Sequence, residues 1–101
     1  MAVGGVGSGA AASTVAVHMV DIAYDQKSLT VPANTPITIN LDNAGVGPHN
    51  FNIDALNVHS GDYQPGQKGT VTFTALPGTY TYYCSQPGHK EAGMVGTLIV
   101  Q

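Results

Sequence analysis

Short β-strands recur along the chain and constrain its fold more than any other feature of the sequence. Ile37, Ile39 and Leu41 alternate with polar residues, the pattern of a strand with one buried face. Glycine- and proline-containing turns separate further runs of β-branched and aromatic residues, at 14–18, 20–24, 28–31, 51–53, 69–75, 79–84 and 95–100. No window keeps a helical period, and 55–68 is expected to be a loop with room for a helical turn. The sequence therefore predicts an all-β fold, a two-sheet antiparallel sandwich of seven or eight strands.

Composition narrows the class of protein. The 101 residues suffice for one domain with a single buried core. Hydrophobic residues make up 43% of the chain and charged residues 9%, which excludes the highly charged disordered class. The net charge of −3, with only three lysines, leaves no basic surface for nucleic acid. Apolar runs are too short to cross a bilayer, so we expect a soluble chain with no membrane-inserted segment. The protein is also expected to be a monomer.

Residues 1–13 differ from everything after them. Glycine, alanine and serine dominate this stretch, which carries no charge and no aromatic group. It is therefore expected to be a flexible tail or linker that precedes a folded domain at 14–101. It lacks the basic start and long apolar block of a signal peptide. Two origins stay open, a spacer below a removed signal or membrane anchor and a tail added for expression, and we favour the spacer.

The last eighteen residues carry the candidate chemistry. Cys84 is the only cysteine, His89 follows it after four intervening residues, and Met94 follows after four more. A second histidine, His49, lies far upstream. Each of these residues taken alone is more often an ordinary core or loop residue. Together, two imidazoles, a thiolate and a thioether are the donor set of a blue-copper electron-transfer centre.

The predicted strands place these donors at strand ends. Cys84 ends one strand, so 85–94 is expected to form a loop at one end of the sandwich, and His49 precedes another strand. If both meet at the same end, the four donors converge. Gly88 and Gly93 would let the loop turn sharply, since glycine has no Cβ to clash.

The segment 77–100 resembles the C-terminal signature of the cupredoxins. Its Gly-Thr-Tyr and Tyr-Cys-Ser portions are similar to plastocyanins, and its longer cysteine-to-histidine spacing is similar to auracyanins and plant phytocyanins. Upstream, Pro48-His49-Asn50 resembles the family's first-histidine motif. The resemblance extends over 14–101 and is strongest in the last 25 residues.

This resemblance implies a Greek-key sandwich that holds one type 1 copper per chain, cycling between Cu(I) and Cu(II). The implied ligands are His49, Cys84, His89 and Met94. It further implies that Asn50 and Ser85 hydrogen-bond across the site, and that His89 lies at the solvent edge as the electron port.

The function implied is that of a small soluble electron carrier. Redox proteins would dock transiently near His89, on a rim of uncharged residues, and Asp21 is expected to lie off that docking face. The chain departs from plastocyanin in its loop length and in lacking an acidic patch, so the identity of the partner is not carried over. An extracytoplasmic location, in the periplasm or at the cell surface, is expected, with a possible membrane tether upstream.

Alternatives from other classes are weaker. Four histidines and one cysteine are too few for a multicopper oxidase or a dinuclear copper site, and nothing orients Cys84 and His89 for hydrolysis, so no enzyme activity is expected. The main rival is a non-redox module, a copper carrier or zinc-binding protein using the same donors. Zinc prefers four strong ligands, and a thioether is a poor one.

Four other side chains lie outside the candidate ligand set. His18 and His59 have no thiol or carboxylate at useful spacing and are expected to be ordinary histidines. Tyr80 is a candidate for a corner tyrosine. Tyr83 has two interpretations, since it could extend an electron route from Cys84 to the surface or simply cover the sheet.

Overall fold

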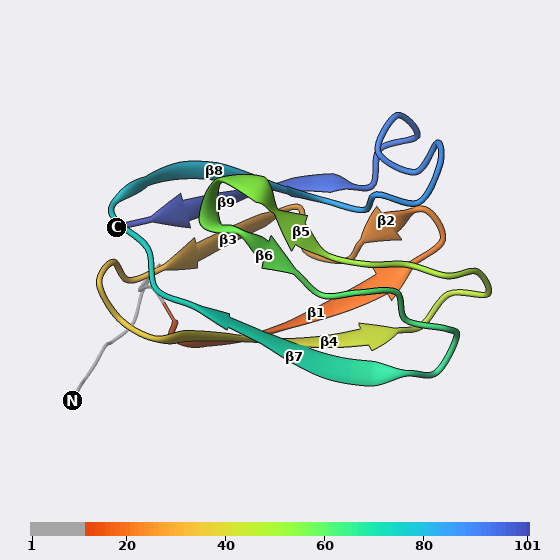
Figure 1. The fold of residues 1–101 in the computed structure, drawn as a ribbon, viewed down its shortest axis with the longest axis horizontal. Coiled ribbons are helices and arrows are strands. Elements are labelled where there is room, and N and C mark those ends of the chain that lie inside the picture. The colour runs from red at the N-terminus through yellow and green to blue at the C-terminus, as the bar shows by residue number, and fades with distance from the viewer. Residues whose placement is uncertain (1–11) are drawn as a thin grey trace.

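Two β-sheets pack face to face in the computed structural model, which describes residues 12–101 (Figure 1). The first sheet contains, in order across it, β2 (Ala23–Tyr24), β1 (Thr14–Val20), β4 (Ile37–Asn43) and β7 (Lys68–Phe73). The second contains, in order, β3 (Ser28–Val31), β9 (Val95–Val100), β8 (Gly78–Tyr83), β5 (Asn52–Ile53) and β6 (Val58–His59). The predicted all-β sandwich is confirmed.

The core follows the alternation seen in the sequence. In β4 the side chains of Ile37, Ile39 and Leu41 are all buried, while the residues between them are more exposed. In β9 the same alternation buries Leu98 and Val100 in the core between the two sheets. Burial of each such side chain contributes about 1.5–3 kcal/mol, so the two inner faces hold the sheets together.

The sheets are mixed, which corrects the expectation of purely antiparallel pairing. β1 lies parallel to β4, with Val15 opposite Ile39, and β3 lies parallel to β9, with Leu29 opposite Leu98. The cause is the path of the chain between β1 and β4, which crosses to the other sheet to form β3 and then returns. Every other pairing in residues 12–101 is antiparallel, including the β8–β9 hairpin that flanks the candidate loop.

The structure differs from the sequence prediction in the segment after β5 and at the start of β1. The segment after β5 contains a short 3-10 helix, η2 (Asp54–Leu56), as the sequence allowed, and then the two-residue strand β6, which it did not predict. At the other end of the chain, the carbonyl of Ser13 already accepts a hydrogen bond from the Thr38 N–H (2.8 Å). Residues 1–11 of the predicted flexible tail lie outside the described residues. Within 12–101 no helix is long and apolar enough to span a membrane.

Three aromatic rings form the core beneath one end of the sandwich. Tyr24 meets Phe51 and Tyr82 edge-on, at centroid distances of 5.6 and 5.2 Å, and Phe51 stacks on Tyr82 at 5.0 Å. The Tyr24 hydroxyl donates to the backbone carbonyl of Asn50 (2.7 Å). Burial raises the pKa of both Tyr24 and Tyr82, so both phenols stay protonated. This cluster gives the segment next to His49 a rigid base.

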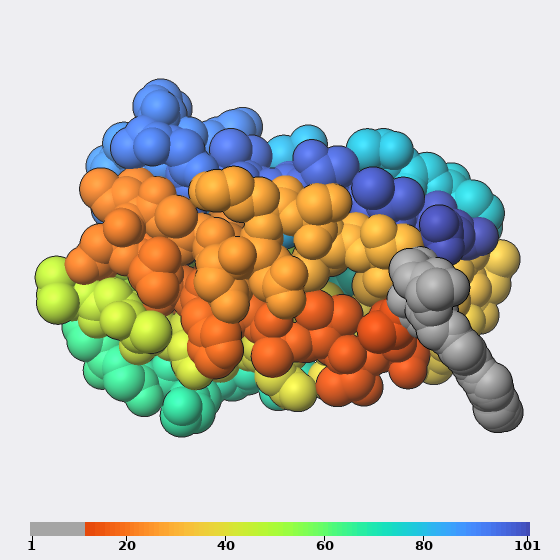
Figure 2. Space-filling view, turned by 180° about the vertical axis from the view of Figure 1, so that it is seen from behind, coloured from red at the N-terminus to blue at the C-terminus, as the bar shows by residue number. Residues whose placement is uncertain are grey.

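Tyr80 makes the contact expected of a corner tyrosine. Its hydroxyl donates to the carbonyl of Leu76, four residues earlier (2.7 Å), and so closes the turn that leads into β8. This corner lies at the opposite end of the sandwich from the loop that joins β8 to β9 (Figure 1). Seen from behind, that loop protrudes at its own end of the molecule (Figure 2).

Candidate metal centre

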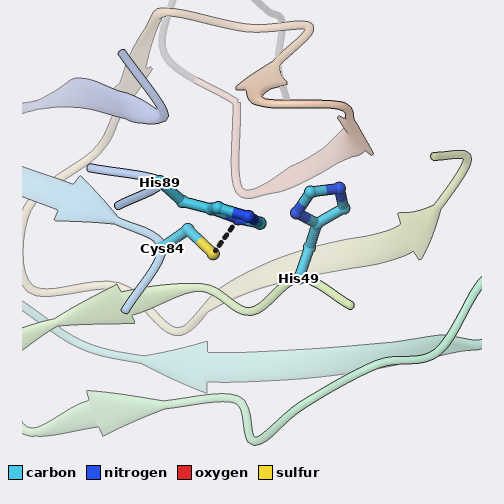
Figure 3. A group of neighbouring side chains, drawn as sticks. All are labelled: His49, Cys84 and His89. Atoms are coloured by element: carbon cyan, nitrogen blue, oxygen red, sulfur yellow. Dashed lines mark hydrogen bonds between the residues drawn. The ribbon is translucent and has the colours of Figure 1, made fainter. Parts of the chain in front are cut away.

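Three side chains from two separate segments converge at the loop end of the sandwich. The ligand atoms of His49, Cys84 and His89 all lie within 4.8 Å of one another. The two imidazole rings lie 5.1 Å apart between centroids, with their planes tilted by 49°, and the thiol lies beside them (Figure 3). The Cys84 Sγ lies 3.5 Å from the His89 Nδ1. In residues 12–101 no other group of three histidine, cysteine or acidic side chains comes this close.

His49 is held by both its backbone and its ring. Its N–H and carbonyl form a reciprocal bridge with Tyr63, at 3.1 and 2.8 Å. Its side chain is only 1% exposed, and its Nε2 lies 2.9 Å from the Asp21 Oδ1. A carboxylate only accepts, so Nε2 carries the proton and Nδ1 holds a free lone pair.

That Nδ1 is buried and has no hydrogen-bond partner. A buried polar atom left unpaired costs roughly 1–3 kcal/mol, so such atoms usually have a purpose. Here the free lone pair belongs to the same cluster as the thiol and His89. A metal ion bound between the three side chains would satisfy it.

The loop between β8 and β9 is a short, internally bonded unit. The N–H of His89 donates to the Gln86 carbonyl, and the N–H of Ala92 to the Gly88 carbonyl, both at 3.0 Å. Gly88 (φ 80°) and Gly93 (φ 112°) adopt left-handed conformations, as predicted from their places in the loop. The loop's own backbone bonds thus help to hold its shape.

Met94 closes this loop. Its N–H donates to the His89 carbonyl (2.9 Å), and its carbonyl accepts from the Cys84 N–H (3.1 Å). Its side chain is fully buried in the core. The backbone of Met94 therefore ties together the two donors of the loop, and its thioether lies inside the protein, where the sequence predicts an axial ligand.

Asn50 and Ser85 hydrogen-bond across the site, as the family resemblance implies. The Asn50 Oδ1 accepts from the Ser85 N–H (2.7 Å), and the Asn50 Nδ2 donates to the Ser85 Oγ (2.9 Å). Asn50 also donates to Asp62 (2.8 Å) and accepts from Asn52 (2.8 Å). The side chain next to one histidine is thus bonded to the residue next to the cysteine.

The other histidines lie outside the cluster. His18 pairs with Asp42 (2.9 Å) on the outer face of the first sheet, and His59 bonds to Asn52 (3.0 Å). Tyr83 is half-buried, with its hydroxyl bonded to Asp54 (2.9 Å) and the Lys90 ammonium 4.6 Å from its ring centre. These contacts hold Tyr83 against the sheet, and its possible part in an electron route remains a prediction.

Asp21 makes a contact that the sequence did not predict. It lies against His49 and also accepts from the Val46 N–H (3.0 Å). Its expected place off the docking face stays a prediction. The hydrogen bond from His49 lowers the pKa of the Asp21 carboxyl, with help from the Val46 N–H. No local signal could have revealed this contact, because 28 residues separate Asp21 from His49, and an aspartate in a turn is common.

Comparison with known proteins agrees with this geometry. Residues 3–100 match the cupredoxin-like domain family. The chain belongs to this family. Among its relatives, this cupredoxin is similar to auracyanin-B of Chloroflexus aurantiacus, at 38% identity, with 78% of the chain and 47% of the relative covered. The chain spans 47 to 66% of the length of the curated relatives, which include plastocyanins.

Solved structures resemble the cupredoxin over nearly their whole length. The dithionite-reduced auracyanin of the photosynthetic bacterium Roseiflexus castenholzii superposes with a TM-score of 0.84, at 27% identity, covering 91% of this chain and 99% of that one. Auracyanin A, described as a "blue" copper protein from the green thermophilic photosynthetic bacterium Chloroflexus aurantiacus, gives 0.73 at 25% identity, covering 87% and 99%. The predicted fold and family are thereby confirmed.

Proposed function

We propose that this chain is a one-electron carrier that holds a single type 1 copper between His49, Cys84, His89 and Met94. The observation that carries the proposal is the buried thiol beside two imidazoles, one of which turns an unpartnered nitrogen into the cluster. Two histidines and one cysteine, with a thioether nearby, fit copper better than any other common metal. Bound copper would supply the one-electron couple between Cu(II) and Cu(I).

The protein's part is to keep its donors in place while the charge of the site changes. The Asn50–Ser85 bonds fix the two ligand-bearing segments relative to each other, and the backbone bonds of Met94 fix the loop. A site that needs no rearrangement when an electron arrives exchanges electrons readily. The backbone bonds within the loop support this role over a catalytic one, which would need an open position for substrate.

Burial argues against the rival interpretation as a metal carrier. Cys84 is 0% exposed and His49 1%, whereas a carrier needs accessible, exchangeable ligands. A structural zinc site usually has four strong donors, and only three are gathered here in the described residues. The same donors therefore favour a resident copper over a transported or structural metal.

His89 is the candidate electron port. It alone among the three clustered side chains is partly exposed. Exposed glycine, proline and alanine residues precede or follow it in the loop, at Pro87, Gly88, Ala92 and Gly93. We propose that a redox protein docks transiently on this uncharged rim, that the carrier acts as a monomer, and that it works outside the cytoplasm, where thiol pools would not compete for its copper.

An absorption spectrum tests the proposal. Copper(II) added to the metal-free protein should give an intense blue band at one copper per chain, and a mild reductant should bleach it. Cys84→Ser should abolish the band and keep a folded sandwich, at a cost of about 1 kcal/mol of stability. His89→Gln should weaken or remove it, whereas the matched control His59→Gln should retain it, since His59 lies outside the cluster. A colourless copper(II) complex of the native protein would favour the non-redox rival.

A further inference from the structure

Asp21 and His49 form a pair that the ligand set alone does not explain. Asp21 lies in the turn between β1 and β2, and its Oδ1 is 2.9 Å from the His49 Nε2. The nitrogen it contacts is the one facing away from the metal cluster, since the free nitrogen of the ring is Nδ1. A carboxylate therefore stands directly behind a proposed copper ligand.

The loop that carries His49 is built around this carboxylate. Both oxygens of Asp21 accept from the Val46 N–H, at 3.1 and 3.0 Å, and Oδ1 is 3.4 Å from the Gly47 N. The loop also packs closely at Gly45, where a Cβ would collide with the Asp21 Oδ1 and lie only 2.9 Å from the His49 Nε2. Glycine at this position gives the aspartate–histidine pair its space.

In such a pair the carboxylate determines which nitrogen of the imidazole can bind a metal. A carboxylate that accepts from one ring nitrogen fixes the tautomer, so the other nitrogen offers its lone pair. It also raises the basicity of the imidazole, because partial proton transfer pushes electron density into the ring. A more basic donor, with a negative charge behind it, stabilises the more highly charged metal state.

We propose that Asp21 is a positioning and tuning residue for His49: its carboxylate holds the ring with Nδ1 turned into the cluster and lowers the reduction potential of the bound copper. This inference rests on the proposed function. If Asp21 only accepted hydrogen bonds from the Val46 loop, as a loop cap does, a neutral acceptor would serve equally well. The proposed role requires the negative charge.

The metal-free protein tests the hydrogen bond itself. At about pH 8, where imidazoles are ordinarily neutral, proton NMR should show the His49 Nε2–H as a slowly exchanging, strongly downfield resonance. Asp21→Asn keeps an acceptor but removes the charge, so this resonance should move upfield. Asp25→Asn is the matched control, since Asp25 bonds to the His18 N–H (2.8 Å) and should leave the resonance unchanged. An Nε2–H unaffected by Asp21→Asn would overturn the proposal.

The copper-loaded protein tests the tuning. Asp21→Asn should raise the midpoint potential, and by more than Asp25→Asn, which removes the same charge from a residue that bonds to His18 and not to His49. Equal shifts in the two variants would mean that only net charge matters and would overturn the tuning role. A lowered melting temperature with an unchanged potential would reduce Asp21 to a loop cap.

Gly45→Ala provides a second variant that alters neither partner. Its Cβ would push the carboxylate and the ring apart, so the Nε2–H should move upfield and the potential should rise, as in Asp21→Asn. If Gly45→Ala leaves both unchanged, the pair is not the source of the tuning. Absence of a blue band in the native protein would instead defeat the proposed function, while the metal-free measurement would still decide whether Asp21 orients His49.

Discussion

Met94 is the donor whose chemistry is easiest to vary without disturbing the others. Its backbone, not its side chain, ties Cys84 to His89, so a substitution leaves the loop bonds in place. Met94→Gln should lower the reduction potential, because an amide oxygen is a harder donor that favours Cu(II). Met94→Leu should raise it by removing the axial donor, at a cost of about 1 kcal/mol of stability. Voltammetry of the two variants checks both signs, and shifts in the same direction would show that Met94 is not an axial ligand.

Single residues also mark the limit of what the sequence could predict. The donors His49, Cys84 and His89 were recognisable because three rare side chains of the right chemistry stand at strand ends. Asp21 was not, because its role arises only when the β1–β2 turn folds against the His49 loop. A residue's chemistry can be read locally, but a pairing across 28 residues depends on tertiary structure.

Among the strands, too, the burial pattern could be predicted from local sequence, whereas the pairing could not. Alternation in 37–41 predicts a half-buried strand regardless of its neighbours, and β4 has the predicted burial. Which strand lies beside β4 is not a property of that pattern, and its parallel pairing with β1 follows from the chain crossing between sheets. The two-residue strand β6 is too short to leave any periodic signal.

The connection between the two ligand-bearing segments depends on one side chain, Asn50. Asn50→Ala would remove all four of its side-chain bonds, including both bonds to Ser85, and leave Asp62 and Asn52 without a partner they now share. We expect a loss of about 2–4 kcal/mol in the free energy of unfolding, at roughly 0.5–1 kcal/mol for each of the four bonds, and faster loss of copper to a chelator.

Ser85→Ala is the matched comparison for Asn50→Ala. It removes only the Oγ acceptor and keeps the backbone N–H that bonds to Asn50, so it should cost about 1 kcal/mol or less. Urea unfolding of the metal-free variants measures both values. Equal losses in the two variants would show that the clamp does not depend on Asn50.

On the outer face of the first sheet, His18 and Asp42 predict a pH dependence that is separate from the metal centre. The hydrogen bond and charge of Asp42, with a smaller effect of Asp25, raise the pKa of His18, while Lys68 opposes them. Because the folded-state pKa lies above the unfolded value, this contact stabilises the protein below about pH 6.5 and is lost as the pH rises through the folded-state pKa.

NMR titration of His18 checks this sign. In Asp42→Asn the pKa of His18 should fall back toward its ordinary value, and the fold should lose the extra stability at mildly acidic pH. His59 serves as the internal reference within the same spectra. A His18 pKa that stays raised without Asp42 would contradict the assignment of its cause.

At the scale of the whole molecule, the surface of the loop end predicts how a partner approaches. The loop end presents uncharged residues around His89, together with Val46, which is 88% exposed in the loop that precedes His49. Nearby, Lys90 and Glu91 carry opposite charges. The turn between β7 and β8, at the opposite end, carries Leu76, which is 69% exposed (Figure 1).

Docking on the loop end should therefore depend on desolvation more than on charge. Ala92→Glu should slow electron transfer to a redox partner about fivefold, as expected for about 1 kcal/mol of added desolvation, without altering the blue spectrum. Leu76→Glu introduces the same charge at the far end and should have little effect. Rates followed by stopped flow should vary only mildly with ionic strength, because opposing charges near His89 give little steering. A steep salt dependence, or a larger effect of Leu76→Glu, would mean that partners dock elsewhere through charge.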